Sequence, residues 1–335
     1  MPPDSDQPTQ DVLERFSRSL GRRCGPLQPV EGGMSGARVW RATTQKGSWA
    51  IRQWPPAGPP AEKIDWIHRV LGHAADRGLD FLPVPLKSDD GHTYISHDGA
   101  FWEVAKWLPG KADANPLGAT KRLLAAAGSL SRFHRAVIDF PQQQGVATQR
   151  RSLVLADRAD RLVVARSIDW QATAEAALRR APAAAEVLRA VANKLAIVLT
   201  AADERVHAVQ TTVVAIQPII RDARREHFLF TGDRVTGLVD FGAMTIDTPA
   251  VDLARLLGEW AGDDRAAWLA AIDAYGLGPI ETGLLAALDF SGTALAAGNW
   301  LRWIANGRPA PADRLCYLEN RLATFANQGH PLEGR

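Results

Sequence analysis

The sequence predicts an α+β protein in which strands come first and helices follow. Short segments of strand character are concentrated between residues 29 and 108. From residue 117 onward, apolar residues recur at helical spacing over long segments. One further strand pair is expected at 228–239, inside the helical part. These observations favour a small antiparallel sheet followed by a larger, mostly helical region.

Composition and charge are those of an ordinary globular protein. The chain has 335 residues, of which 46% are hydrophobic and 23% charged. A formal net charge of +2 gives no overall reason to expect a nucleic-acid or acidic-membrane partner. No uninterrupted apolar run reaches the roughly 18 residues that a transmembrane helix needs. We therefore expect neither nucleic acid nor membrane as a partner.

The ends of the chain and its cysteines suggest a cytoplasmic protein. Residues 1–8 are polar and lack the basic and apolar regions of a signal peptide. Cys24 and Cys316 lie far apart, outside any Cys-x-x-Cys or Cys/His cluster, so structural zinc and a disulfide scaffold are not expected. The sequence does not indicate the oligomeric state.

The strand-rich part begins with a helix and a glycine-rich turn. Apolar spacing predicts a helix over 10–20, and residues 29–42 have strand-like flanks around a turn. Glycine lets a backbone approach phosphates closely, although an ordinary hairpin has the same pattern. The remaining elements expected in this part are a strand at 48–54, a helix at 61–75 and strands at 81–86, 93–96 and 101–108.

The helical part is expected to contain one long helix, a helical segment and four later helices. The expected ranges are 117–137, 152–202, 251–259, 266–275, 281–303 and 312–326, with a further helix considered over 203–213 and a frayed tail over 331–335. The segment 152–202 is rich in Ala, Leu and Arg. Arg151, just before this segment, and Arg158, Arg161 and Arg166 within it either line an anionic pocket or form a solvated face.

The stretch from Ile219 to Leu253 carries the chemistry. Turn residues at 231–234 separate two apolar runs, which predicts a β-hairpin. Asp222 precedes this hairpin and Asp240 ends it, so we expect both carboxylates to face one pocket. Such a pair suits phosphoryl transfer, because one carboxylate can accept the proton of an attacking hydroxyl while the other holds Mg²⁺.

The motifs of this stretch carry a family resemblance. Asp240 begins Asp-Phe-Gly, Asp222 follows Arg221, and Asp252 begins Asp-Leu-Ala. In this order they resemble the active-site segment of the aminoglycoside phosphotransferase and choline kinase-like family, a branch of the protein-kinase-like fold. The resemblance covers about 25–260. It implies a bilobal α+β fold with an antiparallel-sheet N-lobe (1–110) and a helical C-lobe (111–335), the latter including the insertion 152–202.

The resemblance implies roles for residues of the C-lobe. Asp222 would deprotonate the acceptor hydroxyl, and Arg224 would neutralise the transferring phosphoryl group. Asp240 would bind Mg²⁺, and Asp252 would brace the catalytic loop from below. His134 is expected to be structural rather than catalytic.

The resemblance also implies a nucleotide site in the N-lobe. Arg52 occupies the position of the lysine that grips the phosphates, and it could alternatively lie on an exposed strand face. Glu62 could pair with Arg52 or simply favour the start of its helix. The hinge that holds adenine would run from Glu103 to Leu108. The residues expected to bind the nucleotide are Gly32, Gly33, Ser35, Gly36, Arg52, Glu103 and Lys106.

Two departures from the family pattern concern activity. The family usually has His-Gly-Asp where this chain has Ile220-Arg221-Asp222, and it has a metal-binding Asn where this chain has His227. Imidazole is a poor ligand for Mg²⁺, so His227 could bind Mn²⁺, hydrogen-bond the loop, or mark lost activity.

Two functional hypotheses follow. The first is an ATP-dependent kinase of a small hydroxylated molecule, with ATP and Mg²⁺, or Mn²⁺, as cofactors. The alternative is a kinase-like nucleotide-binding protein with little or no activity, acting in regulation. The acceptor pocket is expected between the 152–202 helices and the C-terminal helices, and the arginines of 152–202 argue against a cationic aminoglycoside as the acceptor.

Overall fold

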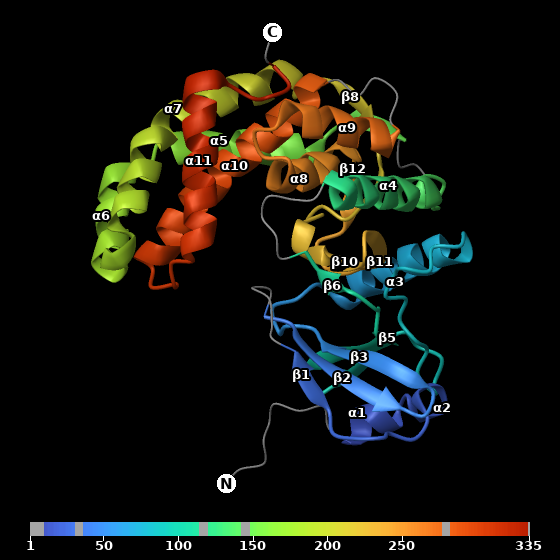
Figure 1. Cartoon of the computed structure of the whole chain (residues 1–335). Coiled ribbons are helices and arrows are strands. Elements are labelled where there is room, and N and C mark those ends of the chain that lie inside the picture. The colour runs from blue at the N-terminus through green and yellow to red at the C-terminus, as the bar shows by residue number, and fades with distance from the viewer. Residues whose placement is uncertain (1–9, 31–35, 114–119, 142–147, 277–281, 334–335) are drawn as a thin grey trace. The chain divides into compact units, whose positions relative to one another are not determined.

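The computed structural model describes residues 10–30, 36–113, 120–141, 148–276 and 282–333, which form two compact units (Figure 1). The first unit comprises 1–112 together with 226–244, and the second comprises 113–225 together with 245–335. The boundary expected from the sequence lies at 110/111 and leaves the hairpin in the second lobe, whereas here the hairpin belongs to the first unit. Each unit is described by itself.

A five-stranded antiparallel sheet forms the first unit, with the strand order β1-β2-β3-β5-β4. Its strands are β1 (Gln28–Val30), β2 (Arg38–Thr44), β3 (Gly47–Gln53), β4 (Ile95–His97) and β5 (Ala100–Lys106). The strand expected at 81–86 is absent, because this segment makes only an isolated bridge between Pro85 and Ala105. A single bridge leaves most of its backbone outside the sheet, so Phe81 and Leu82 are buried without strand pairing.

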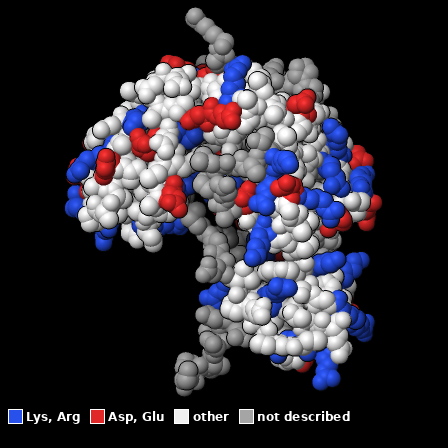
Figure 2. All heavy atoms as spheres, in the orientation of Figure 1, with Lys and Arg blue, Asp and Glu red and all other residues white. Residues whose placement is uncertain are grey.

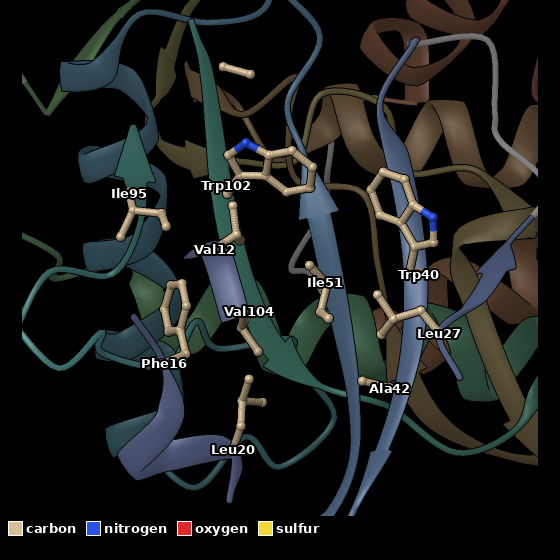
Figure 3. Packing of buried hydrophobic residues seen from close by; sticks show 11 residues of the cluster. Val12, Phe16, Leu20, Leu27, Trp40, Ala42, Ile51, Ile95, Trp102 and Val104 are labelled. Atoms are coloured by element: carbon tan, nitrogen blue, oxygen red, sulfur yellow. The ribbon is translucent and has the colours of Figure 1, made fainter. Parts of the chain in front are cut away.

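One face of this sheet is covered by the N-terminal helices. The single helix expected at 10–20 is in fact two, α1 (Gln10–Glu14) and α2 (Ser17–Leu20). A new helix begins at Ser17 because the Asp89 carboxylate accepts hydrogen bonds from the Ser17 hydroxyl and the Arg18 N–H. The expected apolar face is nevertheless buried. Figure 3 shows it packed with Leu27, Trp40, Ala42, Ile51, Ile95, Trp102 and Val104.

A helix and a smaller sheet complete the first unit. Helix α3 (Ala61–Asp76) has the predicted apolar face. The predicted hairpin is confirmed as β10 (Phe228–Thr231) and β11 (Arg234–Leu238), and β6 (Lys111–Ala112) pairs with β10. Gly110 has φ +98, and a Cβ there would lie 2.7 Å from the Phe230 carbonyl oxygen. Only glycine therefore fits where the chain enters β6.

The second unit is mainly helical, as predicted. Its helices are α4 (Thr120–Val137), α5 (Leu153–Arg166), α6 (Trp170–Arg180), η1 (Pro182–Ala184), α7 (Ala185–Val209), α8 (Ala250–Trp260), α9 (Arg265–Tyr275), α10 (Thr282–Ala305) and α11 (Ala312–Gln328). Two short antiparallel pairs connect them: β7 (Gln149–Arg151) with β8 (Val213–Ala215), and β9 (Gln217–Ile219) with β12 (Thr245–Asp247). Helix α10 is buried along most of its length and packs against α5, α6, α7, α8 and α11.

Two sequence expectations for this unit need correction. Asp203–Val209 is the end of α7 rather than a separate helix, because the buried positions Leu199, Ala202 and Val206 continue one apolar face. Residues 331–333 are not frayed: Leu332 is buried, and Glu333 forms a 2.6 Å ion pair with Arg205. Burial and this ion pair hold the segment in place.

The charged surface is mixed in sign. Over the described residues visible in Figure 2, basic and acidic side chains are interspersed, in keeping with the small net charge. Among the described helices, none combines the length and apolar character that would let it cross a membrane. Both cysteines, Cys24 and Cys316, are exposed free thiols.

Candidate active site

Asp240 follows the hairpin of the first unit and lies beside the guanidinium group of Arg52. Its backbone has φ +65, a left-handed conformation that aspartate tolerates better than most residues. Asp240 Oδ1 is 3.5 Å from Arg52 Nη2, and Asp240 Oδ2 is 3.7 Å from His227 Nε2. The structure thus brings Arg52, His227 and Asp240 together.

Arg52 lies on β3, directly opposite Glu103 on β5. Its guanidinium is 3.7 Å from the Glu103 carboxylate and stacks over Trp54, with 4.0 Å between the guanidinium carbon and the ring centroid. Glu103 Oε2 accepts hydrogen bonds at 2.7 Å from Trp54 Nε1 and at 2.8 Å from His68 Nε2. The other ring nitrogen of His68 is 2.8 Å from the Thr93 hydroxyl. Arg52 is therefore held by a buried polar network.

The electrostatics of this network favour an ionised Glu103. Burial by itself would raise the pKa of Glu103, but the hydrogen bond from His68 and the charge of Arg52 outweigh burial and lower the pKa. Glu62, the residue considered as a partner for Arg52, is exposed, and the ion pairs of Arg52 are with Glu103 and Asp240. A β-strand glutamate thus occupies the role that the family pattern suggested for a helix residue.

The remaining residues predicted to bind nucleotide differ in their surroundings. Gly32, Gly33 and Ser35 lie outside the described residues, whereas Gly36 has φ +74 just before β2. Lys106 ends β5 and is exposed. Glu103 is buried among side chains, so its carboxylate acts on Arg52 and its neighbours rather than as a surface contact at the hinge.

The donors around Asp240 fit a divalent cation in part. A cavity of about 20 Å³, lined by Arg52, Glu103, Asp240 and Phe241 among others, has room for one small ion or water. Mg²⁺ commonly takes one or two carboxylates plus substrate phosphates, which Asp240 satisfies. The His227 imidazole suits Mn²⁺ better than Mg²⁺. Within the described ranges, no group of three or more His, Cys, Asp or Glu side chains could hold a metal.

Asp252 positions the loop that leads to Asp222 in the second unit. Asp252 is fully buried, and its carboxylate accepts hydrogen bonds from the backbone N–H groups of Ile220 (2.7 Å) and Arg221 (2.6 Å). Arg221 has φ +70, a conformation that these two bonds help to maintain. His134 Nε2 lies 3.0 Å from the same carboxylate, which agrees with the structural role expected of this histidine.

Asp222 and Arg224 lie in a cluster of arginines and carboxylates. Arg255 Nε donates a hydrogen bond to Asp222 Oδ1 at 3.2 Å, and its Nη2 is 3.3 Å from Glu259 Oε1. The same oxygen is 3.4 Å from Arg224 Nε and 3.0 Å from Arg314 Nη1. Burial alone would raise the pKa of Glu259, but the three arginines lower it to about 2. Glu259 is therefore ionised and ties the loop to α8 and α11.

The second unit also contains a cavity beside helices of the segment 152–202. A cavity of about 220 Å³ lies among α5, α6 and α10. Its walls are mostly apolar, including Trp170 and Leu295, and Arg161 and Arg302 also line it. This volume has room for a small organic molecule.

Comparison with known proteins shows which family the chain belongs to. The sequence model of the phosphotransferase enzyme family matches residues 26–289, well over half of the chain. The chain belongs to this family. The resemblance noted from the Asp222 to Asp252 motifs is thereby confirmed.

Similar proteins place this phosphotransferase-family chain on a shared fold. A spectinomycin phosphotransferase bound to ADP and spectinomycin is 12% identical, covers 98% of this chain and 98% of its own, and has a TM-score of 0.68. An amicoumacin kinase bound to AMP-PNP and Ca²⁺ is 13% identical, covers 98% of this chain and 96% of its own, and has a TM-score of 0.66. An aminoglycoside phosphotransferase from Alicyclobacillus acidocaldarius matches at 17% identity, 96% and 94% coverage and TM-score 0.63. The predicted α+β fold class is confirmed.

One curated relative is similar in sequence. It is a homoserine kinase from Janthinobacterium sp. (strain Marseille), 23% identical over 222 residues, or 64% of this chain. The match spans 60% of the relative's own length. At this identity and coverage the likeness supports the family and leaves the acceptor to be determined.

Sequence reasoning missed several residues of this site. His68 and Arg255 were not assigned roles, nor were Glu259 and Arg314. His68 had a detectable signal, because it lies four residues after Ile64 and three before Leu71 on the apolar face of α3. The cluster at Glu259 had a signal only for Arg255, which lies four residues earlier on α8, whereas Arg224 and Arg314 come from other parts of the chain.

Proposed function

We propose that this protein transfers the γ-phosphate of ATP to a hydroxyl group of a small molecule. The observation that carries the proposal is the Arg52–Asp240 pair. The Arg52 guanidinium, held by Glu103 and Trp54, lies 3.5 Å from the carboxylate of the Asp-Phe-Gly aspartate. Such a pair offers one group for phosphate oxygens and another for a divalent cation. The nucleotide complexes of the similar phosphotransferases support ATP as the donor.

The second unit supplies the groups proposed to act on the acceptor. Asp222 takes the proton of the acceptor hydroxyl as the new oxygen–phosphorus bond forms and the bond between the β- and γ-phosphates breaks, releasing ADP. Arg224 offsets the charge on the transferring phosphoryl group, as expected from its place two residues after Asp222. Asp252 fixes the loop backbone that leads to Asp222. Positioning and charge thus supply the catalysis.

Asp240 is the residue proposed to hold the divalent cation, together with phosphate oxygens of the nucleotide. When bound, the cation neutralises phosphate charge. His227, 3.7 Å from Asp240, either joins it as a ligand of Mn²⁺ or stays a hydrogen-bonding neighbour. Mg²⁺ and Mn²⁺ are therefore both proposed as cofactors, with Asp240 as the shared ligand.

His227 also favours a second candidate function. Where the family has an Asn, this chain has a nearly buried imidazole, a weak ligand for Mg²⁺. A protein of this kind can bind nucleotide and respond to it without transferring phosphate. The alternative is thus a regulatory nucleotide-binding protein of the same fold.

The test measures nucleotide binding by calorimetry and ADP release, with Mg²⁺ and Mn²⁺ compared. We expect Asp222→Asn to lower turnover about 10²–10⁴-fold while leaving ATP affinity nearly unchanged. Asp240→Asn should weaken nucleotide binding only when a divalent cation is present. Asp80→Asn, a change at an exposed aspartate, serves as the matched control.

Each outcome separates the candidates. Turnover by the wild type that is lost in both variants supports the kinase. Nucleotide binding without turnover, in either metal and across a panel of hydroxylated acceptors, favours the regulatory protein. A wild-type protein that binds no nucleotide would refute both.

A further inference from the structure

Three arginines converge on one carboxylate oxygen beside the proposed base. Glu259 Oε1 is 3.0 Å from Arg314, 3.3 Å from Arg255 and 3.4 Å from Arg224. Arg255 also donates to Asp222 at 3.2 Å, so the cluster is continuous with the proposed base. These side chains come from the loop after β9, from α8 and from α11 of a single compact unit.

The cluster has more positive than negative charge. In the contacts given above, the three guanidiniums of Arg224, Arg255 and Arg314 stand against two carboxylates, those of Asp222 and Glu259. One positive charge is left in excess.

Neighbouring charged groups are engaged on α10 and α11. Arg158 donates hydrogen bonds to the Leu288 carbonyl and the Ser291 hydroxyl. Asp289 and Asp263 both pair with Arg321. The excess charge around Glu259 therefore follows from its own contacts.

A ligand can reach this cluster. The side chains of Arg255 and Arg314 are 26% and 21% exposed, and that of Asp222 is 39% exposed. The Arg321–Asp289 pair of the same unit differs, since its side chains are only 2% and 6% exposed. A buried ion pair of this kind supports the fold, whereas a reachable cluster with surplus positive charge next to a base can take part in binding.

We propose that the acceptor carries an anionic group, a carboxylate or a phosphate, which Arg255 and Arg314 bind while the acceptor hydroxyl faces Asp222. This inference rests on the proposed function and names its substrate class. A guanidinium can present two parallel N–H donors to either anion. The ammonium groups of an aminoglycoside would instead meet like charges.

The first test is an acceptor panel with the full-length wild-type protein, ATP and whichever divalent cation supports turnover. Its arms are glycerate and homoserine for carboxylates, glucose 6-phosphate for phosphates, glycerol and glucose for neutral acceptors, and kanamycin for cations. Phosphorylated product is measured over the acceptor-free background. We expect kcat/KM for at least one anionic arm to exceed the neutral arms by about tenfold or more, the worth of one charge-assisted contact.

The outcomes distinguish this inference from the proposed function. Preference for the carboxylate arm or for the phosphate arm identifies the anion. Equal or better use of neutral acceptors or of kanamycin overturns the inference while leaving the kinase assignment intact. If the protein binds ATP but phosphorylates none of the anionic acceptors, the inference is also contradicted. If the protein binds no nucleotide, the proposed function itself is refuted.

The second test uses Arg314→Met, which removes the charge and keeps most of the side-chain length. KM for the preferred anionic acceptor should rise about tenfold or more, while kcat and the KM for ATP stay within about twofold. Arg314→Lys should recover part of the affinity. The matched control is Arg189→Met at an exposed arginine on α7. A purely structural Arg314 would instead lower the melting temperature and leave the acceptor KM unchanged.

Discussion

Replacing Asp252 by asparagine tests how the loop before Asp222 is held. The buried carboxylate accepts the Ile220 and Arg221 N–H groups on different oxygens, at 2.7 and 2.6 Å. Asparagine keeps one acceptor oxygen and turns an NH₂ group toward the other donor. One charge-assisted hydrogen bond is lost and one buried N–H is left unpaired, which should cost about 2–4 kcal/mol. The melting temperature should fall by about 5–12 °C, at the sensitivity usual for a unit of this size.

The assay is urea unfolding followed by circular dichroism, together with thermal melting and ATP turnover. Asp273→Asn is the control, because Asp273 lies on the exposed side of α9. Turnover should fall at least tenfold in the Asp252 variant, since Arg221 keeps its left-handed backbone only while the loop is held. A change below about 0.5 kcal/mol, the size usual for a surface substitution, would refute this reasoning.

Two further predictions concern Glu259 and Glu103. The pKa of Glu259 is lowered from 4.5 to about 2, so its contribution to stability is present above pH 4.5 and is lost as the pH falls toward 2. The free energy of unfolding of Glu259→Gln should thus be about 3 kcal/mol below that of the wild type at pH 7, and the difference should be less than half as large at pH 3. Urea titrations at the two pH values measure this difference. A difference that does not change with pH would contradict the prediction. Glu103→Gln removes the charge that holds Arg52, so calorimetry should show ATP affinity weakened about 5- to 30-fold, and unchanged affinity would show that Arg52 is oriented without Glu103.

The sequence predicted best those elements that depend on local signals. The hairpin at 228–238 follows from turn residues between apolar runs, and α3 follows from its apolar face. The segment 81–86 shows the limit of this reasoning. Its apolar residues indicate burial, yet strand pairing depends on the neighbour, which here offers only one bridge.

The residues of the candidate site likewise fall into those that local motifs predicted and those that depend on the folded structure. The positions of Asp222, Asp240 and Asp252 came from motifs and their order. The anchor of Arg52 could not be found in this way, because strand register alone sets Glu103 opposite it. Likewise, Glu259 meets Arg314 only because α8 and α11 come together in the folded unit.

The discontinuous first unit has a consequence for biosynthesis. Strand β6 at Lys111–Ala112 pairs with β10, which the ribosome adds only after more than a hundred further residues. At usual rates of translation that interval is on the order of 10 s. The five-stranded sheet can form early, but the separate three-stranded sheet of β6, β10 and β11, which leads into Asp-Phe-Gly, forms only after the intervening segment has emerged. A nascent chain arrested before residue 226 would therefore lack Asp240, the partner of Arg52.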